Sequence, residues 1–140
     1  MNREVIYAAL FSMLSSSGAY KTKSRKLQHW ADVTASRQPA LFQAQRTETA
    51  STVPGQPTVW NLQVDIYVYA NTSNKSEAPS QIINPLLDAI GNALAPDPIT
   101  GKCTLGGLVQ HAWIEGAIQT DEGVLGDQAV AVVPIVIKVV

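Results

Sequence analysis

The stretch VWNLQVDIYVY, residues 59–69, alternates between two kinds of side chain along its whole length. From residue 60 onward its even-numbered members are large and apolar, and its odd-numbered members are polar or tyrosine. Successive side chains of a β-strand point to opposite faces of the sheet, so a period of two is typical of a half-buried strand. The stretch therefore predicts a strand that needs a hydrophobic core on one face.

A partner strand is predicted directly before it. Residues 39–49 begin with Pro39, whose missing N–H costs least at the start of a strand, and then alternate. Residues 50–57 between the two strands contain Pro54, Gly55 and Pro57 and predict a loop. The simplest arrangement of the two strands is an antiparallel hairpin.

The C-terminal part of the chain predicts two further strands, at residues 108–120 and 127–140, joined by a connection that contains glycine. The last one reads QAVAVVPIVIKVV over residues 128–140 and is apolar on both faces. Helices can cover one of those faces. The other face is therefore expected to meet a neighbouring subunit.

Two amphipathic helices are predicted from apolar residues that recur at helical spacing. The first covers residues 2–16, with Asn2 as its N-cap, and the second runs from residue 82 to about residue 94, where Pro85 is tolerated only near the first turn. The remaining segments predict an extended connector at residues 20–33, a mobile polar loop at residues 70–80 and, after residues 96–98 end the second helix, a loop at residues 99–107.

This order favours one α+β domain over residues 1–140: a single four-stranded, mainly antiparallel sheet with two helices packed on one face, in the order α-β-β-α-β-β. An apolar content of 46% with 15% charged residues argues against a disordered chain. The longest apolar run, residues 129–140, is shorter than the roughly 20 residues that span a bilayer as a helix, so no membrane association is expected. The amino terminus lacks a signal-peptide pattern, which predicts a cytoplasmic protein.

Residues that could carry chemistry are few and widely spaced. Cys103 is the single cysteine, which excludes an internal disulfide, and neither His29 nor His111 has the spacing of a metal site. His111 is predicted to be a half-buried strand histidine, and the adjacent acids Asp121 and Glu122 are predicted to lie in a solvated turn. With no phosphate-binding or nucleophile motif present, the sequence predicts no enzymatic activity, no cofactor and no metal.

The net charge of −1 conceals an asymmetry along the chain. Up to Arg46 there are seven basic and two acidic residues, a net of +5, whereas from Thr47 onward there are three basic and nine acidic residues, a net of −6. In a self-associating protein such opposite patches can pair between subunits. The alternative is two solvated faces that never meet.

A basic segment with aromatic neighbours at residues 20–30 also resembles a nucleic-acid contact. The overall pI of about 6.1 is below that of a dedicated nucleic-acid-binding protein, so specific recognition is the less favoured interpretation. Non-specific contact between this segment and transiting DNA is a separate expectation.

Several phrases of the chain, taken in order, resemble the tail terminator or tail completion proteins of long-tailed bacteriophages. They are SRKLQHWADV at residues 24–33, QPALFQ at 38–43, WNLQVDIYVYAN at 60–71, INPLLDAIGNAL at 83–94 and TLGGLVQHAWIEGAIQTDEG at 104–123. Together they cover most of the chain. The resemblance rests on pattern, since no single motif carries a chemical function.

The resemblance implies a structural virion protein of the phage tail that assembles in the host cytoplasm. Such a subunit forms a homo-oligomeric ring, commonly a hexamer, on the end of the polymerised tail tube. There it ends tube elongation and presents a head-tail joining surface to the head-completion or connector protein. Its expected partners are further copies of itself, the major tail tube protein and that connector protein. The charged residues we select as candidate assembly-interface residues are Lys21, Lys23, Arg25, Lys26, Arg46, Glu115, Asp121 and Glu122.

Two alternatives remain open at this point. Within the same class, the chain could be a head-tail connector or another minor tail protein. From a different class, it could be a monomeric binding module, which would show neither ring formation nor tube binding.

Overall fold

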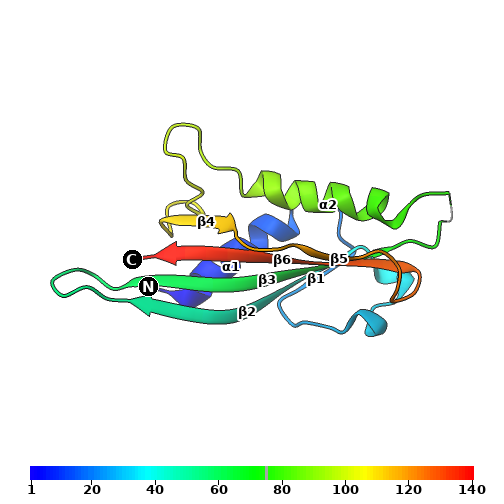
Figure 1. Ribbon diagram of the computed structural model, residues 1–140, viewed down its shortest axis with the longest axis horizontal. Coiled ribbons are helices and arrows are strands. Elements are labelled where there is room, and N and C mark those ends of the chain that lie inside the picture. The colour runs from blue at the N-terminus through cyan, green and yellow to red at the C-terminus, as the bar shows by residue number, and fades with distance from the viewer. Residues whose placement is uncertain (75) are drawn as a thin grey trace.

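The computed structural model describes residues 1–74 and 76–140 and shows a mixed α+β fold with two α-helices and one six-stranded sheet (Figure 1). Residue 75, in the loop predicted to be mobile, lies outside the described residues. The elements in chain order are α1 (Arg3–Ser15), β1 (Thr22–Ser24), the short 3-10 helices η1 (Trp30–Asp32) and η2 (Ala35–Arg37), β2 (Ala40–Ser51), β3 (Val59–Asn71), α2 (Pro79–Ala93), β4 (His111–Ile114), β5 (Gln119–Asp121) and β6 (Gln128–Val139).

The sheet has the strand order β1-β2-β3-β6-β4, and β5 pairs with β6 on the same side as β4. β1 runs parallel to β2, and every other pair is antiparallel. The predicted hairpin of residues 39–49 and 59–69 is confirmed as β2 and β3. The last strand, β6, lies in the interior of the sheet, where it pairs with β3 over residues 128–139.

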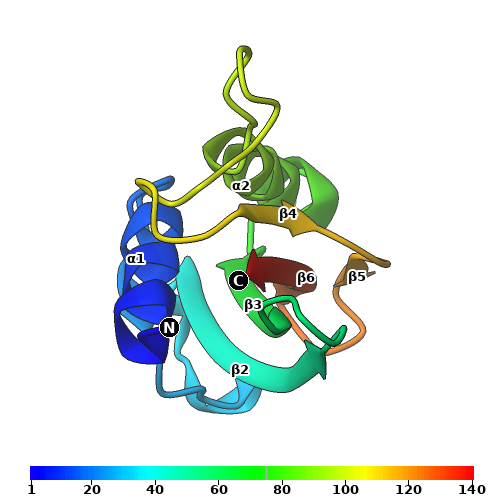
Figure 2. The same ribbon diagram turned by 90° about the vertical axis from the view of Figure 1, so that its left-hand side faces the viewer.

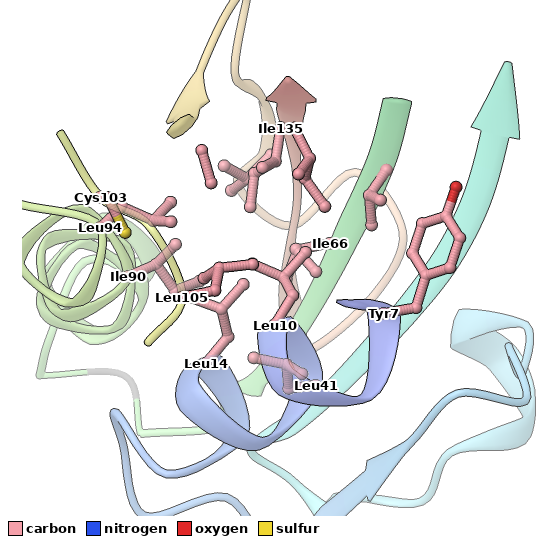
Figure 3. Packing of buried hydrophobic residues seen from close by; sticks show 14 of the residues in the cluster. Tyr7, Leu10, Leu14, Leu41, Ile66, Ile90, Leu94, Cys103, Leu105 and Ile135 are labelled. Atoms are coloured by element: carbon pink, nitrogen blue, oxygen red, sulfur yellow. The ribbon is translucent and has the colours of Figure 1, made fainter. Parts of the chain in front are cut away.

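The core lies on one face of the sheet, between the strands and both helices (Figures 2 and 3). Leu10 and Leu14 of α1 and Ile83 and Ile90 of α2 are fully buried in one cluster with the even-numbered residues of β3, such as Ile66. Both helices therefore pack on the same face, as predicted. The mixed α+β class is confirmed, although the sheet has six strands rather than four.

α1 begins as the sequence predicts, since the Asn2 side chain accepts a hydrogen bond from the Val5 N–H at 3.2 Å. The apolar residues 5, 6, 9, 10, 13 and 14 predict its buried stripe, and the structure departs from that stripe at one point. Val5 is exposed, and Tyr7 is buried in its place. The ring of Tyr7 packs into the core while its hydroxyl reaches a strand carboxylate, a combination that hydrophobic periodicity alone does not indicate.

α2 begins earlier than predicted, at Pro79, which places Pro85 inside the helix rather than in its first turn. The Gln81 side chain explains the earlier start, because its Oε1 accepts a hydrogen bond from the Ala78 N–H at 2.6 Å and so satisfies one of the free donors at the helix end. Pro85 is exposed, on the side of the helix away from the core.

The predicted strand at residues 108–120 is wrong as a single element, since it forms two short strands, β4 and β5. The cause lies on β6. Pro134 has no N–H to donate, and its carbonyl accepts from the Glu115 N–H, so its ring nitrogen faces the break between β4 and β5. Gly116, with φ of +103°, turns the chain away at this point.

The connector predicted to be extended at residues 20–33 contains more structure than expected. It forms β1 on the edge of β2 and then η1, which η2 follows. In the part of the chain that the structure describes, no helix combines the length and the apolar character needed to cross a membrane.

Candidate assembly interface

The second face of the sheet, opposite the helices, carries a trough that crosses its strands. One end is a hollow of about 440 Å³ whose lining includes Arg46, Tyr67 and Val132. The other end is a hollow of about 580 Å³ whose lining includes Asn61 and Trp113. A smaller hollow of about 190 Å³ shares lining residues with both, so the three form one continuous depression, which we call the trough.

β6 provides the apolar floor of the trough. Its odd-numbered residues from Ala129 to Ile137 belong to the core, so its even-numbered residues face the other way. Val132 and Pro134 are half-buried there, and Val136 lies beside them. Within the described residues no helix lies over these three side chains, which agrees with the expectation that this chain's own helices cover only one face of β6.

An ion pair, Arg46–Asp65, lies at the middle of the trough. The two side chains are 3.2 Å apart, with 9% of the Asp65 side chain exposed and 57% of the Arg46 side chain exposed. A buried carboxylate without a partner is strongly destabilising, so Asp65 holds the guanidinium over the floor. Arg46 therefore lies on the candidate interface, but its charge is balanced within the chain.

The end of the second face next to β1 is covered by the chain itself. Val33, Ala40, Phe42 and Tyr69 form a small second core under the η1–η2 segment. The Tyr69 hydroxyl donates to the Gln28 carbonyl oxygen at 2.7 Å, and burial, with the neighbouring Tyr67, raises the pKa of Tyr69 to about 12. The connector thus limits the trough to the rest of the second face.

Four of the five basic candidates, all except Arg46, group at the β1 edge of the sheet. Lys21, Lys23 and Lys26 are exposed, on or directly beside β1. Arg25 differs from them, because its guanidinium pairs with Glu4 of α1 and its Nη2 donates to Gln45 Oε1 at 3.4 Å. Of these four residues at the β1 edge, the three lysines are therefore available to a partner, and Arg25 ties α1 to the strands.

The acidic candidates lie at the opposite edge. Glu115 follows β4 and also borders the trough, Asp121 ends β5, and Glu122 follows it in an exposed turn. The Asp121 Oδ1 accepts hydrogen bonds from the N–H groups of Gly123 and Val124, at 3.0 and 2.9 Å. Asp121 therefore stabilises the turn, as a solvated turn residue should, while Glu122 projects freely.

Sequence reasoning missed a polar cluster that joins α1 to the hairpin. Glu48 accepts from Arg3 Nε at 2.7 Å and from the Tyr7 hydroxyl at 2.8 Å, and the Arg3 guanidinium lies 5.1 Å from the Trp60 ring centroid. The hydrogen bond from Arg3 lowers the pKa of Glu48, and burial raises the pKa of Tyr7 above its ordinary value. Glu48 is 45 positions from Arg3 and 41 positions from Tyr7, so no local pattern signals the cluster.

His111 lies half-buried in β4, as predicted. Its Nδ1 accepts a hydrogen bond from the Cys103 N–H at 3.0 Å, and its ring stacks on Trp113 with centroids 4.9 Å apart. His111 thereby attaches the loop before β4 to the sheet. Over residues 1–74 and 76–140, no group of three or more His, Cys, Asp or Glu side chains is arranged to hold a metal ion.

No protein-family model matches the chain, and no curated protein matches it.

Proposed function

We propose that the chain is a structural subunit of a bacteriophage tail that caps the tail tube as a ring, ends tube elongation and provides the head-tail joining surface. The observation that carries the proposal is the trough. A groove with an apolar floor and a polar rim is the usual form of a protein-binding surface, and neither helix covers this one.

Two further features support an assembly role. Apolar side chains stand exposed at the tips of two loops, Val53 in the β2–β3 connection and Ile99 in the α2–β4 connection. In Figure 1 the β2–β3 connection extends beyond both termini, and the α2–β4 connection rises from the same half of the molecule beside the end of α2. Ile99 is held in a fixed turn, because Asp97 Oδ1 accepts from the N–H groups of Ile99 and Thr100. Anchors held in place before binding lose less conformational entropy in a complex.

In this proposal the protein acts in the virion tail, after assembly in the host cytoplasm, and its partners are its own copies, the major tube protein and the connector protein. The free subunit is a monomer or a weak oligomer, whose association strengthens as ionic strength falls. A connector or other minor tail protein would use the same surface against a different neighbour, and a monomeric binding module would use the trough alone.

The test is the length of the tails in phage that carry a Val132→Asp variant. A charge on the trough floor should prevent docking, because a partner would have to desolvate it. We expect tails of irregular, excessive length without attached heads in electron micrographs. The matched control is Val124→Asp, which places the same charge on an 89% exposed loop residue outside the trough and should leave tails normal.

Both variants are first compared by thermal melting, so that a folding defect is recognised. Tails of normal length, with heads attached, in phage carrying a folded Val132→Asp protein would contradict the proposal. Irregular tails with both variants would show that the effect of the added charge is not specific to the trough, which would remove this support for the proposal.

A further inference from the structure

We propose that neighbouring copies of this chain join through their two opposite sheet edges, with β1 of one copy adding to β5 of the next in an antiparallel pair. The inference rests on the proposed ring and specifies its subunit contact. The partner is a second copy of this chain, bound head to tail rather than face to face.

The two edge strands β1 and β5 lie at the same level of the sheet. Residues that pair between neighbouring strands form rows across the sheet. One such row consists, in order from β1 to β5, of Lys23, Leu41, Val68, Ala131 and Thr120. β1 and β5 thus lie at the same height along the strand direction, at opposite edges. In a closed ring the two contacting patches of each subunit lie at the same height along the ring axis. β1 and β5 meet this condition if the ring axis is parallel to the strands.

The directions of the two edge strands also suit a contact between copies. β1 is parallel to β2, and three antiparallel pairings then separate β2 from β5, so β1 and β5 run in opposite directions. Rotation about an axis along the strands leaves their directions unchanged. β1 of one copy therefore meets β5 of the next in antiparallel orientation, the arrangement in which residues directly opposite each other can pair.

The charges at the two edges are opposite in sign. At equal height Lys21 of one copy lies opposite Glu122 of the next, and Lys23 lies opposite Thr120. Side chains in the row of Lys23 point to the helix side of the sheet, because that row includes core residues. On that side Thr120 lines a hollow of about 710 Å³ that also borders Asp88 of α2. Lys23 of the neighbour thus enters a hollow that contains a carboxylate.

The other free edges are poorer candidates. Beyond Phe42 the outer edge of β2 has a register shift between Gln45 and Glu48, and such bulges hinder strand addition. The outer edge of β4 is partly used, since the Ala112 N–H donates to the Cys103 carbonyl oxygen at 2.9 Å. Within the described residues, β1 and β5 are three-residue edge strands, and each pairs with a strand on its inner side only.

The contact is tested by carbodiimide cross-linking of the full chain at low ionic strength, where weak association is strongest. The reagent joins a lysine amine to a carboxylate in contact, with loss of water. A mixture of ¹⁵N-labelled and unlabelled protein identifies links between chains by mass spectrometry. We expect Lys21–Glu122 and Lys23–Asp88 links of mixed isotope. Absence of inter-chain links between these edges, or links that involve other surfaces instead, would overturn the inference.

Charge reversal gives a sharper test. A chain with Lys21→Glu and Lys23→Glu has two acidic edges, and a chain with Asp88→Lys and Glu122→Lys has two basic edges. Each alone should associate at least about tenfold more weakly than the native chain at low salt. An equimolar mixture, or one chain with all four changes, should regain association.

The matched control is Lys102→Glu with Glu77→Lys, exposed residues away from both edges, which should associate as the native chain does.

The outcomes separate this inference from the proposed function. If the four-residue reversal fails to restore association while native protein still ends tube growth, the contact is wrong and the proposed function stands. If tails are of normal length without the protein but β1–β5 links form, the function is wrong and the contact stands. Equal association of both two-residue variants and the native chain overturns the contact directly.

Discussion

The two faces of the same sheet are built by alternate residues of the same strands, yet they differ in what covers them. Val133 of β6 is 1% exposed beneath the helices, whereas Val132, the residue before it, is half-buried on the floor of the trough. The helix side is closed by side chains of this chain, and the trough is left without such a cover in the described residues. The comparison separates side chains that stabilise the subunit from side chains that are available to a partner.

The largest loss of stability should come from a substitution on the helix side of the sheet. Replacement Ile66→Ala removes a fully buried side chain from the centre of the core, so we expect a loss of about 2–5 kcal/mol in the free energy of unfolding. Equilibrium denaturation in urea measures it. A loss below about 1 kcal/mol would mean that the core collapses around the smaller side chain. The two faces would then differ little in their contribution to stability.

The most direct comparison uses the two adjacent valines of β6. Val133→Ala should lose about 2 kcal/mol, because two buried methylene equivalents are worth about 0.8 kcal/mol each and a cavity adds to this. Val132→Ala should lose less than about 1 kcal/mol, since that side chain already contacts solvent. Equal losses in thermal or urea unfolding would contradict the difference between the faces.

The Glu48 cluster at the edge of the core predicts a pH dependence. The folded state lowers the pKa of Glu48, so the stabilisation is present above the ordinary carboxyl pKa of about 4.5 and is lost as pH falls through the lowered value. Glu48→Gln should therefore unfold with a shallower dependence on pH below about 4.5 than the native protein does. Urea titrations between pH 3 and pH 7 test the slope, and identical slopes would show that the Arg3 contact does not persist in solution.

The smallest effects on stability should come from the exposed charges. Lys23→Glu and Glu122→Lys should change the free energy of unfolding by no more than about 0.5 kcal/mol. Arg25→Ala should cost slightly more, up to about 1 kcal/mol, because Arg25 pairs with Glu4 at a partly exposed site. Thermal melting compares the three, and a large loss for Lys23 or Glu122 would place these residues in the fold rather than in an interface.

Local patterns alone predicted the α+β class, the first helix with its Asn2 cap, the β2–β3 hairpin and the apolar second face of the last strand. These features depend on residues close together in the chain, where a period of 2 or 3.6 and a capping side chain act directly on the backbone. The candidate charged residues were also visible, together with the separation of positive and negative charge along the chain.

Only the tertiary structure decided which of those charges are balanced within the chain and which face outward. Arg46 with Asp65 and Arg25 with Glu4 pair across long stretches of sequence, while Lys23 and the residues of β5 are placed at one height by four successive strand pairings. The break between β4 and β5 likewise depends on Pro134 of another strand. Strand order and register arise from packing between distant segments, and a linear pattern specifies the faces of a strand but not its neighbours.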